Sequence, residues 1–271
     1  MFSWNKHTRS FLNWKRKVEL KIYIRKQNLR LSENNLKFIG LRFAVVYVAI
    51  MKRVLIIGNS GGIGASLENE YTFRQWNCVG VSRSRHGLDF NEPETIQKTL
   101  SSIEGLFETI IIATGALTLN GYGPEKTIRS LTSQGMAEQM QINAIGPALV
   151  LSNIIRLIPK DCPARIAVLS ARVGSIGDNR LGGWVSYRAS KAALNQIIHT
   201  ASIEFARSHP QLVCFSLHPG TVETPLTKQF VASHPSCSAS EIAPTLFEVI
   251  ESRNAVDTGN FFDQNGLPVP W

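Results

Sequence analysis

The chain has 271 residues, enough for one α/β domain with a sizeable core, and its 44% hydrophobic content is ordinary for a soluble globular protein. Its formal net charge of +9 is concentrated in residues 1–50, which hold eleven Lys and Arg against two acidic residues. Residues 51–271 hold 18 basic and 18 acidic residues, so the larger part of the chain lacks the excess charge that favours nucleic acid. We therefore predict no nucleic-acid partner.

Residues 1–50 form a basic extension whose role the sequence leaves open. Its composition resembles that of a targeting peptide, or its apolar run 43–50 could attach it to a membrane surface. That run is much shorter than the roughly 20 residues that a membrane-spanning helix needs, so we expect no span. A third interpretation, which we favour, is that Met51 is the first residue, because it leads directly into an apolar strand.

From Met51 onward, short apolar runs alternate with helical patterns, which indicates βαβ units. The predicted fold is α/β, a Rossmann-type doubly wound parallel sheet in a single domain of residues 51–271. Strands are predicted at 53–57, 78–82, 109–113, 165–169, 212–217 and 259–262, with a short strand ending near Asp89. Helices are predicted at 62–75, 92–103, 134–157, 185–207 and 239–252.

A glycine turn, Gly58-x-x-x-Gly62-Ile63-Gly64, follows the first predicted strand and contains Ser60. Gly58 permits a tight turn, Gly62 lets the backbone approach a pyrophosphate, and Gly64 allows close helix packing. The N-terminus of the following helix offers free N–H groups to phosphate. The turn therefore predicts a dinucleotide site.

Ser82 and Arg83 end the second predicted strand. An acidic residue at this point holds the ribose hydroxyls of NAD, whereas hydroxyls and an arginine suit the 2′-phosphate of NADP. We therefore predict NADP as the cofactor, with Arg83 as its phosphate ligand.

The cysteines and histidines indicate no metal site. Four cysteines are scattered without a Cys-x-x-Cys pair, which is typical of reduced thiols in a cytoplasmic protein. Three histidines, His209, His218 and His234, each precede a proline, and we interpret them as turn residues.

Tyr187 and Lys191 lie four residues apart in a predicted helix, so both side chains can reach one ligand. A tyrosine hydroxyl exchanges protons poorly at neutral pH, and a nearby ammonium group lowers its pKa. The pair is therefore a candidate acid/base.

Four motifs follow one another after residue 51: the glycine turn, Asn143 in Gln141-Ile142-Asn143-Ala144-Ile145-Gly146, Tyr187-x-x-x-Lys191, and Pro219-Gly220-Thr221-Val222-Glu223-Thr224. With them, residues 51–271 resemble the short-chain dehydrogenase/reductase family. The segments Ser170-Ala171-Arg172-Val173-Gly174-Ser175-Ile176 and Phe262-Asp263-x-x-Gly266, with Trp271, resemble its C-factor and sniffer-type carbonyl reductase branch.

The resemblance implies a role for each matched residue. Tyr187 would exchange a proton with the carbonyl or alcohol oxygen, and Lys191 would bind the nicotinamide ribose and lower the tyrosine pKa. Asn143 would bend its helix and hold a water in the proton path. The other implied cofactor contacts are Asp89 and Phe90 at the adenine, Ala113 and Gly115 at the adenosine ribose, and Val222 and Thr224 near the carboxamide.

Two segments depart from the family pattern. The family's Asn-Asn-Ala-Gly is replaced by Ala113-Thr114-Gly115-Ala116, and its catalytic serine is replaced by Ala171. Ser170 or Ser175 would have to substitute for that serine. We favour Ser170, because it keeps the closest backbone position.

The resemblance implies an NADP-dependent reductase of small aldehydes or ketones, with homodimers or homotetramers formed through helices 134–157 and 185–207. Ala171 and the C-factor resemblance motivate the alternative, a non-catalytic NADP-binding sensor or signalling protein. The intact Tyr187, Lys191 and Asn143 favour the enzyme.

Overall fold

The computed structural model describes residues 51–224, 227 and 236–271. Residues 1–50 and His234 lie outside this range, so the interpretations of the basic extension stay predictions. In the described ranges, none of the helices combines the length and apolar character required to cross a bilayer.

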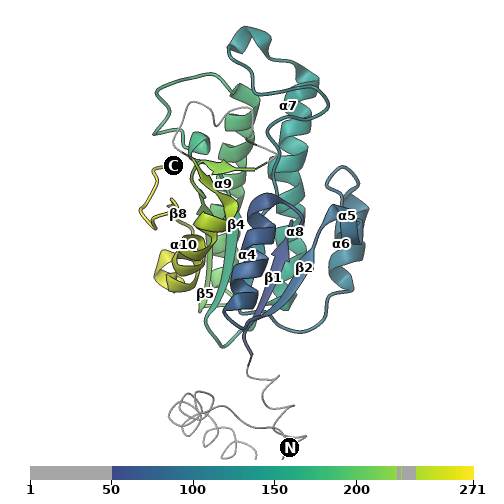
Figure 1. The fold of residues 1–271 in the computed structure, drawn as a ribbon, viewed down its shortest axis with the longest axis vertical. Coiled ribbons are helices and arrows are strands. Elements are labelled where there is room, and N and C mark those ends of the chain that lie inside the picture. Colours follow the sequence, from purple (N-terminus) through teal and green to yellow (C-terminus); the bar gives the residue numbers. More distant parts are fainter. Residues whose placement is uncertain (1–50, 225–226, 228–235) are drawn as a thin grey trace, which may run out of the picture. The chain divides into compact units, whose positions relative to one another are not determined.

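One parallel sheet of six strands organises the domain (Figure 1). Its order is β2-β1-β3-β4-β5-β8, so the strand order reverses between β1 and β3. In open sheets of this kind, ligands bind at the carboxyl ends of the strands beside that reversal. The strands are β1 (Arg53–Ile57), β2 (Asn77–Val81), β3 (Thr109–Ile112), β4 (Ala164–Leu169), β5 (Leu212–Leu217) and β8 (Phe261–Phe262).

The predicted doubly wound parallel fold is confirmed, but the predicted strand near Asp89 is wrong. The Asp89 N–H donates to Thr95 Oγ1 at 2.9 Å, and Thr95 Oγ1 donates back to the Asp89 carbonyl at 3.0 Å. These backbone groups are therefore used in a turn that leads into the next helix, where a strand would need them for a neighbouring strand.

Helices cover both faces of the sheet. They are α4 (Gly62–Phe73), α5 (Arg83–His86), α6 (Pro93–Ser101), α7 (Ser133–Met140), α8 (Gly146–Ile154), α9 (Val185–Ala206) and α10 (Ala239–Ser252). The short α5 was not predicted. The predicted helix 134–157 consists of α7 and α8, separated by a π-helical turn at Gln141–Ile145, and a 3₁₀ turn at Ile155–Leu157. Two short strands, β6 (Val222–Glu223) and β7 (Cys237–Ser238), form a separate pair.

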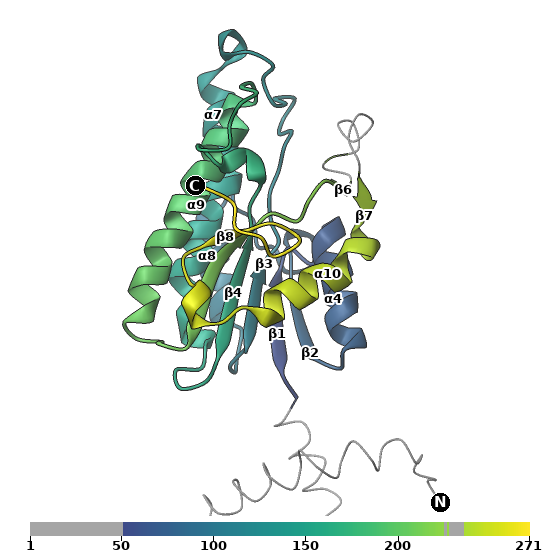
Figure 2. The ribbon, with the colours of Figure 1, turned by 90° about the vertical axis from the view of Figure 1, so that its left-hand side faces the viewer.

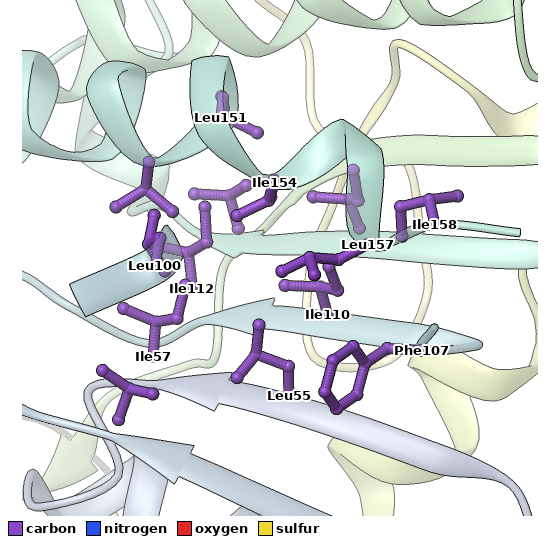
Figure 3. Packing of buried hydrophobic residues seen from close by; sticks show 14 of the residues in the cluster. Leu55, Ile57, Leu100, Phe107, Ile110, Ile112, Leu151, Ile154, Leu157 and Ile158 are labelled. Carbon is purple, nitrogen blue, oxygen red and sulfur yellow. The ribbon is translucent and has the colours of Figure 1, made fainter. Parts of the chain in front are cut away.

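The strand side chains alternate between two apolar cores. Leu55, Ile57 and Ile110 point to one face and pack with α6, α8 and α9, whereas Val54 and Ile56 point to the other and pack with α4 and α10. Figure 2 places α8 and α9 on one side of the strands and α4 and α10 on the other, and Figure 3 shows part of the first core. Burial on both faces explains why these strands read as continuous apolar runs.

Candidate active site

A cavity of about 780 Å³ lies at the carboxyl ends of β3, β4 and β5, beside the start of α4. It is therefore located where a doubly wound sheet binds its ligand. Residues predicted from the sequence that line it are Gly62, Ile63, Ala113, Gly115, Ser170, Tyr187, Lys191, Val222 and Thr224.

The glycine turn brings the chain close to its neighbours. Gly58 has a φ of +97°, and a Cβ there would lie 2.7 Å from the Ala113 carbonyl oxygen. A Cβ on Gly62 would lie 2.8 Å from Thr224 Cγ2, and one on Gly64 would meet the backbone of Gly58. Gly61, at the N-cap of α4, makes no side-chain cap, so the first N–H groups of α4 are left for a ligand.

Two buried oxygens close to this turn have no hydrogen-bond partner within the described residues. They are Asn59 Oδ1 and Thr114 Oγ1, and Thr114 also lines the cavity. A buried polar atom without a partner costs about 1–3 kcal/mol, so a polar ligand that supplies one is stabilised here. The glycine cradle, the free N–H groups and these oxygens fit a dinucleotide.

Asn143 lies in the π-helical turn between α7 and α8 and is completely buried. Its Oδ1 accepts the Ala116 N–H at 2.9 Å, and its Nδ2 donates to the Ala116 carbonyl at 2.8 Å. Asn143 therefore fixes the segment after β3 against the helix. A Cβ on Gly115 would lie 3.2 Å from Asn143 Oδ1 and 3.4 Å from Lys191 Nζ, so the glycine lets both side chains approach.

Tyr187 and Lys191 project from the first two turns of α9 into the cavity, and both are buried. Lys191 Nζ donates to the Leu169 carbonyl at 3.1 Å. Burial raises the pKa of Tyr187 to about 12 and lowers the pKa of Lys191 to about 8. The pKa of Tyr187 is raised, whereas the lysine charge was expected to lower it, because desolvation of the phenol dominates. The phenol therefore holds its proton at neutral pH, as a proton donor must.

The first turn of α9 is fixed by Glu125. The Trp184 N–H donates to the Glu125 carbonyl at 2.5 Å, and the Ser186 N–H donates to its carboxylate at 3.1 Å. The Ser186 hydroxyl bonds the same carboxylate. Trp184 has a φ of +53°, and its ring lies edge-on to Tyr187 with the centroids 6.2 Å apart. These contacts position Tyr187, the next residue along the helix.

The two candidate serines lie in different places. Ser170 lines the cavity beside Ala171, and its hydroxyl donates to Asn195 Oδ1 at 2.6 Å. Ser175 is turned toward the C-terminal segment, where its hydroxyl donates to the Pro270 carbonyl at 2.5 Å and accepts the Asp178 N–H at 3.0 Å. Ser170 is therefore the candidate serine that lines the cavity, although its hydroxyl bonds Asn195 in this structure.

The remaining predicted residues lie outside the cavity lining. Ser60 is exposed in the glycine turn, Ser82 is buried at the end of β2, and Arg83 is exposed at the start of α5. The Asp89 carboxylate accepts the Asn91 N–H at 3.0 Å, and the Phe90 ring lies in the core against Gly146. The predicted adenine contacts of Asp89 and Phe90 stay predictions.

His218 is a cavity residue that the sequence interpretation assigned only to a turn. It follows β5 directly and lines the cavity. Burial, together with the charge of Arg172, lowers its pKa to about 4, so the ring is neutral. Its position immediately before Pro219-Gly220, a motif expected at the cofactor, could have indicated that His218 belongs to the site. The sequence interpretation also missed Arg172, Asp178, Arg180, Trp184 and Arg188 as cavity residues.

Two known proteins are similar to this chain in sequence. A dehydrogenase of 1-hydroxy-2-glutathionyl-2-methyl-3-butene from Rhodococcus sp. is 26% identical over 237 residues, which cover 82% of this chain and all of that protein. C-signal of Myxococcus xanthus is 34% identical over 137 residues, covering 50% of this chain and 78% of C-signal.

Solved structures show the same fold. A short-chain dehydrogenase/reductase from Burkholderia multivorans, with bound NADP, superposes with a TM-score of 0.70 at 26% identity, covering 82% of this chain and all of that one. Carbonyl reductase Sniffer of D. melanogaster also gives a TM-score of 0.70, at 22% identity and the same coverage.

The family model for short chain dehydrogenases matches residues 52–234, which contain the glycine turn, Asn143, Tyr187 and Lys191. This match agrees with the resemblance predicted from the four motifs. The chain therefore belongs to the short-chain dehydrogenase family and is an oxidoreductase.

Proposed function

We propose that this oxidoreductase uses NADPH to reduce an aldehyde or ketone to an alcohol, with Tyr187 as the proton donor. The observation that carries the proposal is one cavity that joins the α4 N-terminus to a buried, protonated Tyr187 and to Lys191. Structural similarity to the NADP-bound Burkholderia protein supports the choice of cofactor.

Different groups of the protein would bind the cofactor and transfer the proton. The first N–H groups of α4 and the glycine turn would hold the pyrophosphate, and the Lys191 ammonium would bind the nicotinamide ribose. When bound, the cofactor supplies the hydride. Tyr187 would donate its proton to the developing alkoxide oxygen, and the nearby ammonium would stabilise the resulting phenolate.

The proposal is tested by following NADPH oxidation at 340 nm with a panel of aldehydes and ketones. Turnover of at least one member, with formation of the alcohol, supports a reductase. Tight NADPH binding without turnover of any member would instead favour the alternative of a sensor, which Ala171 and the similarity to C-signal motivate.

We expect NADPH to bind more tightly than NADH, because Arg83 begins α5 directly after β2 and Ser82, and its guanidinium would bond a 2′-phosphate. Such charge-assisted bonds contribute about 1.5–3 kcal/mol each, or roughly ten- to a hundredfold in affinity. Arg83→Ala should remove most of this preference, whereas Arg207→Ala, at the far end of α9, should not. Titration of both cofactors by calorimetry measures it, and equal affinities in the unchanged protein would contradict the assignment.

Ser170, rather than Ser175, is proposed to steady the substrate oxygen after its hydroxyl turns away from Asn195. Loss of one such donor typically lowers kcat by about 10²–10³. We expect that loss in Ser170→Ala, whereas Ser175→Ala should lower thermal stability and leave kcat within a few-fold, because its hydroxyl bonds the C-terminal segment. Adding Ala171→Ser to Ser170→Ala should restore part of kcat. A large kcat loss in Ser175→Ala alone would reverse the assignment.

A further inference from the structure

The side of the cavity away from the glycine turn carries excess positive charge. Arg172 follows β4, Arg180 lies in the segment that precedes α9, and Arg188 lies on α9. Among the described residues that line the cavity, the acidic side chain is Asp178 alone. A ligand with a negatively charged group would be attracted to this part of the cavity.

Arg188 holds the wall of the cavity. Its guanidinium donates to the carbonyls of Gly183 at 3.0 Å, Gly182 at 3.2 Å and Val173 at 3.3 Å. These bonds link the segment before α9 to the segment after β4. They also occupy the N–H donors of Arg188 with backbone carbonyls. Arg188 therefore shapes the mouth, and the binding of a ligand would fall to the other two arginines.

Arg172 and Arg180 flank Asp178. Arg172 Nε donates to Asp178 Oδ2 at 2.5 Å, and the Arg172 side chain remains half exposed. The hydrogen bond from Arg172 holds the pKa of Asp178 below its ordinary value, and the charge of Arg180 lowers it further. Two guanidinium charges thus share one carboxylate. One positive charge is left over, which matches a single negative charge on a ligand.

Arg180 keeps donors available at the rim. Within the described residues, its side chain bonds the carbonyl of its neighbour Asn179 at 3.2 Å through Nη1 alone. Asp263, the other carboxylate near Arg172, lies outside the lining and accepts the N–H groups of Asn265 and Leu267. It does not compete for Arg180.

We propose that the substrates are carbonyl compounds that carry a carboxylate at the end remote from the carbonyl, bound by Arg180 with Arg172. A guanidinium can bond both oxygens of a carboxylate, which adds direction to the charge attraction. Leu117, Val173 and Leu181 line the same cavity and provide an apolar surface for the part between the two groups. This inference rests on the proposed reductase function.

The test uses two aldehydes that differ in charge and by one methyl group, 4-carboxybenzaldehyde and its methyl ester, methyl 4-formylbenzoate. We expect the unchanged enzyme to favour the acid in kcat/KM by about tenfold or more, mainly through KM, because one charge-assisted bond is worth roughly that factor. Arg180→Gln and Arg172→Gln should each reduce the acid-to-ester ratio by about tenfold. Arg207→Gln, an exposed arginine at the far end of α9, should leave the ratio unchanged.

Several outcomes would overturn the inference. An acid-to-ester ratio near one in the unchanged enzyme, or a ratio unaltered by Arg180→Gln, excludes carboxylate binding by these arginines. If neither aldehyde is reduced, the reductase proposal fails for this class. In that case, calorimetry measures the affinity of each aldehyde for the protein with bound NADP⁺, and so tests the preference for a negative charge without turnover. Equal affinities for the acid and the ester would also overturn the carboxylate inference.

Discussion

Replacing Tyr187 by Phe is expected to lower kcat for carbonyl reduction by about 10²–10⁴, the usual contribution of a positioned general acid. The change removes one oxygen from a ring that is buried against the cavity and has Trp184 at its edge. Its phenol holds a proton at neutral pH because burial raises the pKa to about 12. Without that hydroxyl, the developing alkoxide loses its proposed proton donor, while the shape of the site is kept.

Three measurements separate this effect from damage to the fold. Tyr187→Phe should bind NADPH with unchanged affinity, melt within a few degrees of the unchanged protein, and raise KM much less than it lowers kcat. Tyr122→Phe is the matched control, because Tyr122 lines a separate pocket of about 200 Å³, which Tyr187 also borders, and does not line the main cavity. A Tyr187→Phe enzyme that retains kcat within threefold would show that another group donates the proton.

The sheet and most of the cavity could be predicted because their signals are local in the sequence. The apolar runs identified all six sheet strands to within two residues, and the glycine spacing placed the turn at the start of α4. The Tyr187 to Lys191 spacing placed two side chains on one helical face. Each of these features depends on neighbours within a few residues.

Contacts between distant segments could not be predicted. The sequence favoured Ser170 over Ser175 from its backbone position alone, whereas the contacts of these serines with Asn195 and Pro270, 25 and 95 residues away, respectively, are set by the fold. The resemblance implied that Asn143 bends its helix, but it did not reveal the bonds of Asn143 to Ala116, 27 residues earlier. The Asp89 turn was missed for another reason: Thr95 binds its backbone groups, and a short apolar pattern cannot reveal that competition.

The direction of the Tyr187 pKa is the most informative of these differences. The sequence indicated a lysine four residues away, whose charge would lower the pKa, but the burial that outweighs it comes from the packing of α9 in the folded domain. The spacing of residues in the sequence indicates which side chains lie close together. The polarity of their surroundings, which sets the desolvation, depends on the folded core.

Lys191 is expected to set the pH dependence of reduction. Burial lowers its pKa to about 8, and the ammonium is the form that binds ribose hydroxyls and stabilises the phenolate left after proton transfer. A lowered pKa means that the active form is present below about pH 8 and is lost as pH rises above it. Reduction should therefore be level near neutral pH and should decline on the alkaline side.

Lys191→Met should lower kcat by about 10²–10³, the usual cost of removing one electrostatic stabiliser, and should abolish the alkaline decline. Lys191→Arg should keep the charge throughout the range and also lack the decline, at a rate set by how well the larger guanidinium fits beside Gly115. Neither Tyr187, with a pKa of about 12, nor His218, with a pKa of about 4, titrates near pH 8. A decline near pH 8 that persists in Lys191→Met would therefore place the titrating group outside the residues that line this cavity, or on the bound cofactor or substrate.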